Sequence, residues 1–400
     1  MAFFIGILIF FLVRCRSVFY TDFQPEIFLE EYTKFSQGQG FYSDDRLYAL
    51  AGWMYVHGTS PDKINAAHPP LAKYMIGFSE FAFMNHVMLG LVISVITLTI
   101  VYLISRRFLS AFPFALLPTL LLSLDEMYIY FSSVSMLDIY ATFFTTLSLL
   151  LLILSEKRSR AAPLFYVAAG LALSCKWTTV FLLALPPLLH VLRRDWRRLR
   201  TYPLYLIIAA LTYTATYAAF FLAGNGIQDF IDLQWRMLGI HQERRLEAGT
   251  PRPFWILLNF LTGIEGPTKV QILSLNPGNR TITVIGRETG LSLLEWYNPL
   301  TWPLSFSASL LALYYMRWNR QIAAMPMGFL LLLASVSVGK PFIWYLLPGL
   351  PFAFLSLVFV INSIYLESAN RWARRTTLGL YIVSIIVWSV LVDLPPYIKT

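Results

Sequence analysis

The sequence predicts an all-α polytopic membrane protein with about eleven transmembrane helices and interfacial helices in two long external loops. Of its 400 residues, 57% are hydrophobic and only 13% are charged, and the mean hydropathy is +0.60. Apolar runs close to the length needed to cross a bilayer about 30 Å thick recur along almost the whole chain. A soluble enzyme is therefore excluded, and residues 1–400 are expected to form one membrane-embedded domain.

Short basic breaks between the apolar runs predict the orientation in the membrane. Five breaks hold 15 of the 31 basic residues but only Glu156 and Asp195 of the 22 acidic ones. They are Arg106-Arg107, 156–160, 193–200, 317–320 and 371–375. Excess Lys and Arg in short loops marks the cytoplasmic side. We therefore expect a multi-pass protein of the cell membrane with its N-terminus inside and its C-terminus outside; the net charge of +9 gives no ground for a nucleic-acid partner.

The individual helices follow from these breaks. Residues 1–13 carry neither a basic start nor a small-residue cleavage site, so they are expected to be a first helix and not a signal peptide. A second helix is expected at about 86–105 and a last one at about 376–394. Between them the chain is expected to cross out and back over 108–155, 161–192, 201–316 and 321–366.

The two long external loops span residues 14–85 and 224–299. In the first, "PEIFLEEYTKF" and "RLYALAGWMYV" show helical spacing of apolar residues, and Pro69-Pro70 suits another helix start. The second opens with a similar stretch, "DFIDLQWRMLGIHQ", and these helices are expected to lie along the membrane surface. Near its end, β-prone arms around Asn-Pro-Gly-Asn predict a hairpin, beside a glycosylation sequon at Asn279.

Under this topology, ionisable residues from six separate segments fall on one external face. They are Asp44, Asp45, His68, Lys73, Asp125, Glu126, Asp138, Lys176, His241 and Lys340. Ionisable groups at membrane depth are costly and usually gather at a functional cavity. The sequence therefore predicts an active site at the outer surface.

Four motifs carry a resemblance to a known family. They are "DDRLY" at 44–48, "HPPLAKYMIG" at 68–77, "MLDI" at 136–139 and "CKWTTVF" at 175–181. With them the chain resembles the dolichyl-phosphate-mannose–protein mannosyltransferases, most of all their compact prokaryotic members. The resemblance implies a GT-C-like fold and the inverting transfer of mannose from dolichyl- or polyprenyl-phosphate-mannose to Ser/Thr hydroxyls of proteins. It also implies that the reaction takes place on the extracytoplasmic face.

For that reaction, Asp44 is the candidate catalytic base, because the acceptor hydroxyl must lose its proton as it attacks the sugar. The alternative is a helix N-cap, since acids after Ser43 precede an apolar-periodic run. Asp45 is expected to position the acceptor or a metal, or to be only a solvated acid.

Four basic side chains are candidates for contacting the donor phosphate. Lys176 stands between two apolar arms, where a fixed cation would stabilise the departing phosphate, and Lys340 is argued the same way. His68 is expected to contact the phosphate or orient Asp44, or else to cap a turn. Lys73 is expected either to bind phosphate or to extend its ammonium to the interface.

The remaining site candidates are two aspartates and a histidine. Asp125 and Asp138 bracket an external turn, and we expect either a structural pairing with Lys176 or a direct role in the site. His241 and the acids near it leave a divalent metal open, but no tight metal-ligand spacing supports one, and no cofactor is assigned.

Two other functions compete with this interpretation. With the same donor chemistry, the acceptor could be a glycolipid or an N-glycan precursor instead of a protein. A secondary transporter would place polar groups near the bilayer midplane, often within inverted repeats. The charges here fall on one face and no internal repeat appears, which argues against a transporter.

Overall fold

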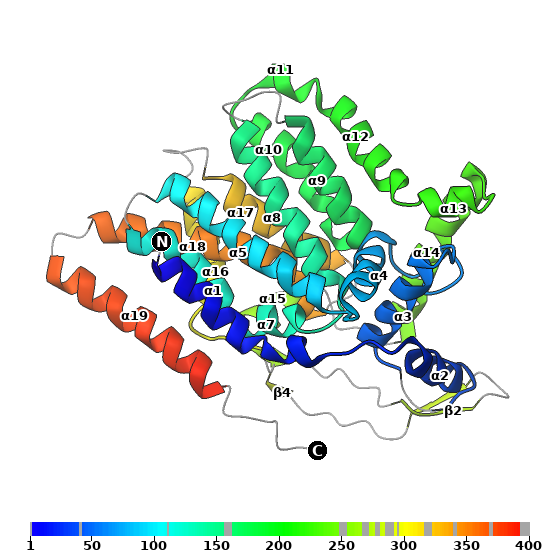
Figure 1. Ribbon diagram of the computed structural model, residues 1–400. Helices are drawn as coiled ribbons and strands as arrows, with labels where there is room; N and C mark the ends of the chain where they lie inside the picture. The colour runs from blue at the N-terminus through cyan, green and yellow to red at the C-terminus, as the bar shows by residue number, and fades with distance from the viewer. Residues whose placement is uncertain are drawn as a thin grey trace.

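The computed structural model describes residues 2–39, 42–109, 112–155, 162–247, 254–265, 272–276, 281–284, 292–293, 296–315, 322–338, 342–367 and 371–392. Within these residues the protein is built almost entirely of helices, as predicted (Figure 1). Lys340 and Asn279, which the sequence singled out, lie outside them.

The N-terminal part forms four α-helices and a 3-10 turn. They are α1 (Ala2–Arg14), η1 (Arg16–Tyr20), α2 (Pro25–Ser36), α3 (Asp44–Val56) and α4 (Leu71–Phe83). The predicted first helix and the predicted helical stretches of the first loop are therefore present. Helices α3 and α4 touch through Gly52 and Gly77: a Cβ added at Gly77 would lie only 2.1 Å from the Gly52 carbonyl oxygen. Only glycine permits this backbone contact, which fixes the position of α3.

In the described residues, the middle of the chain forms eleven helical elements, two of them with 21 residues each. They are α5 (Met88–Phe108), α6 (Phe112–Ser123), α7 (Glu126–Ser132), α8 (Leu137–Ser155), α9 (Ala162–Cys175), η3 (Trp177–Ala184), α10 (Leu185–Leu192), α11 (Trp196–Leu199), α12 (Tyr202–Ala215), α13 (Ala218–Leu222) and α14 (Ile227–Glu247). Helices α8 and α9 pack against each other as a hairpin. The start of α8 and the end of α9 therefore share one end of the hairpin.

The C-terminal part adds helices and two short β-ribbons. Its elements are α15 (Phe254–Thr262), β1 (Ile264–Glu265), β2 (Ile272–Asn276), β3 (Thr281–Val284), β4 (Ser292–Leu293), α16 (Trp302–Tyr315), α17 (Ala324–Val338), η4 (Ile343–Gly349), α18 (Leu350–Glu367) and α19 (Arg371–Val392). Strands β2 and β3 pair antiparallel, which confirms the hairpin predicted there, and β1 pairs with β4. Helix α19 lies at the edge of the bundle (Figure 1).

The predicted count of eleven membrane spans is not confirmed. In the described residues, three helices are long and apolar enough to cross a bilayer: Met88–Phe108, Leu137–Ser155 and Ile343–Leu366. The pair Phe114–Ser123 and Glu126–Ser132, bent by 62°, would make a fourth if it forms one span. Other apolar helices have only 10–17 residues, fewer than the roughly 20 that a straight crossing takes. The finding supports an integral membrane protein with several apolar spans.

One large apolar core joins most of these helices. Both cysteines, Cys15 and Cys175, are buried in it as free thiols. The charged residues described below lie where helices of this core begin or end.

Candidate active site

A buried ion pair joins the two helices of the α8–α9 hairpin. Helix α9 ends at Cys175, and the extended backbone of Lys176 (φ −158°, ψ 130°) separates it from η3. The Lys176 Nζ lies 2.5 Å from Oδ1 of Asp138, in the first turn of α8, and 3.5 Å from the centroid of the Tyr345 ring. A buried cation requires such partners, because an unpaired charge would lose its hydration without compensation.

Only one oxygen of the Asp138 carboxylate, Oδ1, takes part in this pair. Its side chain is 1% exposed, and its second oxygen, Oδ2, has no hydrogen-bond partner in the described part of the chain. Buried carboxylate oxygens are normally satisfied, so an orphaned one marks a place where another donor is expected. A hydroxyl or amide of a bound substrate would supply that donor.

Asp44 lies close to this pair. It interacts electrostatically with both Asp138 and Lys176, although about 90 residues or more separate it from them in the sequence. Its side chain is exposed, and it makes no hydrogen bond or ion pair within the residues that the structure describes. The N-cap position of α3 belongs to Ser43, so Asp44 is the first helical residue and not the cap. An exposed, unbonded carboxylate is available to accept a proton.

Asp45 has different neighbours from Asp44. It is half-buried and interacts electrostatically with Tyr42, Arg46 and His86. Burial lowers the pKa of His86 to about 4, so that imidazole is neutral beside Asp45. The two acids of the motif therefore belong to different surroundings, and only Asp44 couples to the Lys176–Asp138 pair.

Aromatic side chains form a wall next to Lys176. The His68 ring lies 4.9 Å from that of His241 on α14 and 5.9 Å from that of Tyr48 on α3, centroid to centroid. His241 also lies 6.4 Å from Trp177, whose Nε1 donates to the Tyr213 hydroxyl at 2.9 Å. The structure thus brings the two predicted histidines, His68 and His241, close to each other. His241 also lies near Trp177, the residue that follows Lys176.

Lys73 is placed differently from the sequence expectation. Its Nζ is buried and donates three hydrogen bonds, to the Asn65 carbonyl at 2.6 Å, the Asn65 Oδ1 at 3.3 Å and the His68 carbonyl at 2.9 Å. Burial lowers its pKa to about 7. The ammonium neither extends to water nor has a donor left for a phosphate. It holds the loop that carries His68.

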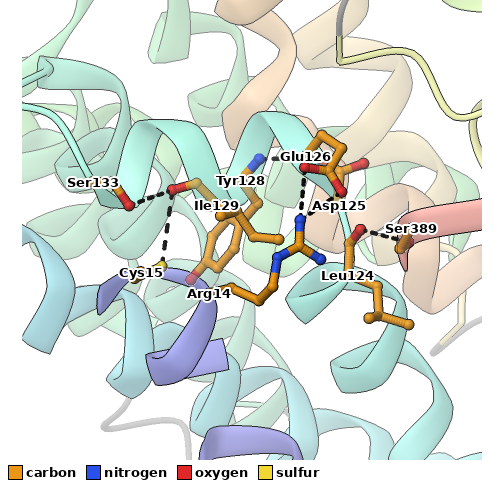
Figure 2. A network of polar contacts seen from close by, with 9 residues as sticks. All are labelled: Arg14, Cys15, Leu124, Asp125, Glu126, Tyr128, Ile129, Ser133 and Ser389. Carbon is orange, nitrogen blue, oxygen red and sulfur yellow. Dashed lines mark hydrogen bonds and ion pairs between the residues drawn. The ribbon is translucent and has the colours of Figure 1, made fainter. Parts of the chain in front are cut away.

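Asp125 belongs to a separate polar network (Figure 2). It caps α7: its Oδ1 accepts from the Tyr128 backbone N–H at 3.0 Å, and its Oδ2 accepts from Trp302 Nε1 at 2.7 Å. Next to it, Arg14 forms an ion pair with Glu126 at 2.9 Å. Of the two aspartates predicted as partners for Lys176, the structure therefore selects Asp138, and both oxygens of Asp125 are satisfied elsewhere.

The described residues contain no group of three or more His, Cys, Asp or Glu side chains arranged to hold a metal. His241 contacts aromatic rings instead. Sequence reasoning did not single out Tyr345, whose ring covers Lys176. Its position beside Lys176 depends on packing between η4 and α8, which no local pattern reveals.

Comparisons with known proteins identify a matching family model and two similar solved structures. The family model described as dolichyl-phosphate-mannose-protein mannosyltransferase matches residues 82–224, which include Asp138 and Lys176. Among solved structures, ArnT from Cupriavidus metallidurans bound to undecaprenyl phosphate is similar with a TM-score of 0.60 at 14% identity, covering 97% of this chain and 71% of that one. Its apo state matches with a TM-score of 0.60 at 15% identity, over 96% and 62% of the two chains. No curated protein matches.

The helical fold, shared with ArnT along almost the whole chain, together with the family match defines the class: a membrane glycosyltransferase of the GT-C type. Within that class, residues 82–224 match the model of the dolichyl-phosphate-mannose-protein mannosyltransferase family. The family resemblance found in the sequence is thereby confirmed over residues 82–224, which include the motifs at 136–139 and 175–181.

Proposed function

We propose that the chain transfers mannose from a polyprenyl-phosphate carrier to Ser or Thr hydroxyls of proteins, with inversion, at the extracytoplasmic face. The family match over residues 82–224 supports the sugar and the acceptor. The crystal structure of ArnT with undecaprenyl phosphate supports a polyprenyl-phosphate carrier for a protein of this fold. The basic breaks of the sequence support the side of the membrane.

One observation carries the assignment of roles: an exposed, unbonded carboxylate, Asp44, couples electrostatically to a buried Lys–Asp pair built from distant helices. In the proposed reaction, Asp44 takes the proton of the acceptor hydroxyl while that oxygen bonds to the sugar C1. The bond between C1 and the phosphate oxygen breaks, and the lipid phosphate leaves with the electron pair. A single displacement of this kind inverts the configuration at C1.

Lys176 and Asp138 are proposed to act on the donor. The positive charge of Lys176 stabilises the negative charge that the leaving phosphate gains, and Asp138 keeps the ammonium in place through the 2.5 Å contact. The orphaned Oδ2 of Asp138 is suited to accept a hydrogen bond from a sugar hydroxyl. His68 and His241, together with Trp177, form an aromatic wall against which a sugar ring can pack.

The test is a transfer assay with radiolabelled polyprenyl-phosphate-mannose and a Ser/Thr-rich peptide. Asp44→Asn should reduce transfer at least about 100-fold, the usual contribution of a positioned base. Asp22→Asn, which neutralises another exposed acid of the same loop, should leave transfer unchanged. Undiminished transfer by Asp44→Asn would remove Asp44 from this role.

The same assay separates the acceptors. Label that enters a glycolipid or an N-glycan precursor, but not the peptide, would keep the donor chemistry and replace the protein acceptor.

A further inference from the structure

A second apolar cluster, separate from the main core, lies beside the candidate active site. It is built by α12, α13, α14 and the turn between the first two of these helices, which lie at one side of the molecule (Figure 1). Its buried members are Tyr213, Tyr217, Phe220, Leu233 and Met237. The proposed reaction assigns these five side chains no role.

The three segments that carry the aromatic wall all meet this cluster. Ala66, two residues before His68, packs against it, and so does Trp177 itself. Met237, a buried member, lies one helical turn before His241 on α14. In the wall, the His241 ring lies 4.9 Å from that of His68 and 6.4 Å from that of Trp177, centroid to centroid. The relative positions of the three wall rings therefore depend on how this cluster is held together.

The hydroxyl of Tyr213 is the polar centre of the cluster. It accepts a hydrogen bond from Trp177 Nε1 at 2.9 Å and donates one to Gln234 Oε1 at 2.7 Å. The Tyr217 hydroxyl lies 3.1 Å from it, and Tyr217 is the donor there, because the single Tyr213 proton goes to Gln234. A hydroxyl has one donor and two acceptor positions, and Tyr213 uses all three. It thereby links η3 to α14 through α12.

Helix α12 is in turn fixed to α9, the helix that ends just before Lys176. A Cβ added at Gly170 of α9 would lie only 2.8 Å from the Ala209 carbonyl oxygen of α12. Only glycine permits so close a backbone contact, and tight packing leaves little freedom to slide. Ala209 is one turn before Tyr213. The Tyr213 hydroxyl therefore has a defined position relative to the end of α9.

Apolar packing alone does not set the direction of the Trp177 ring, because burial of apolar surface has no directional preference. A hydrogen bond does, since the Nε1–H must point at the Tyr213 oxygen. Trp177 is only half-buried, so part of its ring stays open to a ligand. We infer that Tyr213 is a positioning residue for the donor sugar, because its hydroxyl orients the Trp177 ring beside His241. This inference rests on the proposed function, in which the sugar packs on that wall.

The experiment measures donor kinetics of the full-length protein in the mannose transfer assay. Tyr213→Phe removes the hydroxyl and keeps the ring. It should raise KM for polyprenyl-phosphate-mannose roughly tenfold, the usual effect of leaving one buried polar group without its partner. The kcat should stay within about threefold of the wild type. The Ki of polyprenyl phosphate should stay within about twofold, because this ligand has no sugar for the wall to contact.

The split between these constants separates positioning from a merely structural role. A loss of folded protein lowers the apparent kcat but leaves KM unchanged, so partial unfolding of the variant does not imitate the expected result. Tyr205→Phe is the matched control on the same helix. The Tyr205 ring stacks on that of Tyr166 at 5.0 Å, and its hydroxyl makes no hydrogen bond in the described residues. All three kinetic constants of this control should equal those of the wild type.

A double variant tests whether Tyr213 acts through Trp177. Trp177→Phe removes the indole N–H that Tyr213 accepts and should itself raise KM for the donor. Adding Tyr213→Phe to it should then raise KM by less than about threefold more, because residues that act through one contact are not additive. A further rise of roughly tenfold would show that Tyr213 acts independently of Trp177 and would overturn the inference.

The remaining outcomes distinguish this inference from the proposed function. An unchanged KM in Tyr213→Phe, or an equal rise in KM and in the Ki of polyprenyl phosphate, would overturn the inference while wild-type transfer leaves the proposed function standing. A wild type that transfers no mannose from this donor would overturn both.

Discussion

Asp125 and Asp138 are a natural comparison within one molecule. Each is 1% exposed and lies at the start of a helix. Asp125 uses both oxygens, one for the Tyr128 N–H and one for Trp302 Nε1. Asp138 uses one oxygen for Lys176 and leaves the other without a partner in the described residues. The two side chains are equally buried, but only the Asp125 carboxylate has a hydrogen-bond partner for each of its oxygens in the described residues.

The difference shows how to separate structural from functional buried acids. A carboxylate that accepts one hydrogen bond from a helix N-terminus and another from an indole is satisfied without a substrate. A carboxylate that leaves an oxygen orphaned, beside a lysine and an exposed acid, keeps that oxygen for a substrate. The hydrogen-bond partners of the oxygens therefore distinguish two acids that have the same burial and charge.

The largest effect should follow from breaking the Lys176–Asp138 pair. Lys176→Met should leave Asp138 as an unpaired buried acid, at a cost of roughly 3–5 kcal/mol in unfolding free energy, and should reduce mannose transfer at least about 100-fold. Unfolding and transfer rate are measured on the same samples.

The double variant Asp138→Asn/Lys176→Met separates the two effects of this change. It should recover most of the stability, because no uncompensated charge remains, but not the transfer activity. Recovery of both the stability and the transfer activity would show that the Lys176–Asp138 pair has only a structural role.

A smaller and different effect is expected at the acid whose oxygens are both satisfied. Asp125→Asn should lose the charge-assisted bond from Trp302 Nε1 and lower the unfolding free energy by roughly 1–3 kcal/mol, while kcat for the folded fraction stays within about twofold. The measurement is a denaturation curve beside transfer kinetics. A large fall in kcat without loss of stability would contradict the prediction that Asp125, unlike Asp138, has no part in transfer.

The smallest effect sharpens the comparison with a third buried acid, Glu80 of α4. Neither of its oxygens has a hydrogen-bond partner in the described residues, and burial raises its pKa to about 10. A raised pKa gives stability that is present below the unfolded value of 4.5 and is lost as pH rises through about 10. The melting temperature should therefore fall between pH 6 and pH 9.

Glu80→Gln should flatten this slope and raise the melting temperature at pH 8 by roughly 2–4 °C. Glu30→Gln, which changes an exposed acid paired with Lys34, serves as the control and should keep the slope. Identical slopes in the wild type and Glu80→Gln would mean that Glu80 does not titrate in this range.

Local features were predictable from sequence where they depend on nearby residues. The helices at 2–14 and 44–56, the break at Lys176 and the β2–β3 hairpin all follow from apolar spacing and turn residues. The number of membrane crossings could not be predicted in this way. Helix α6 contains Pro118 and bends into α7, and α9 has only 14 residues. Periodicity does not tell whether two short helices make one crossing or two.

Within the candidate site, the sequence identified residue types but not their partners. Asp125 and Asp138 look alike in the sequence, and the choice between them depends on Trp302, 177 positions away from Asp125. The position of Lys73 depends on the loop at Asn65, which has a φ of 48°. The backbone carbonyl of Asn65 accepts a hydrogen bond from the Lys73 ammonium. Long-range contacts of this kind leave no local signal.

The α8–α9 hairpin places the Lys176–Asp138 pair at one of its ends, and Leu152 and Ser155 of α8 lie at the other. Its length is close to the hydrocarbon thickness of an average bilayer, so both ends cannot meet their interfaces at once in a membrane that is much thinner or thicker. Tilt of the hairpin would then move either the ion pair or the opposite end of the hairpin away from its interface. Acyl-chain length thereby becomes part of the enzyme's working environment, on equal terms with the chemistry of its donor.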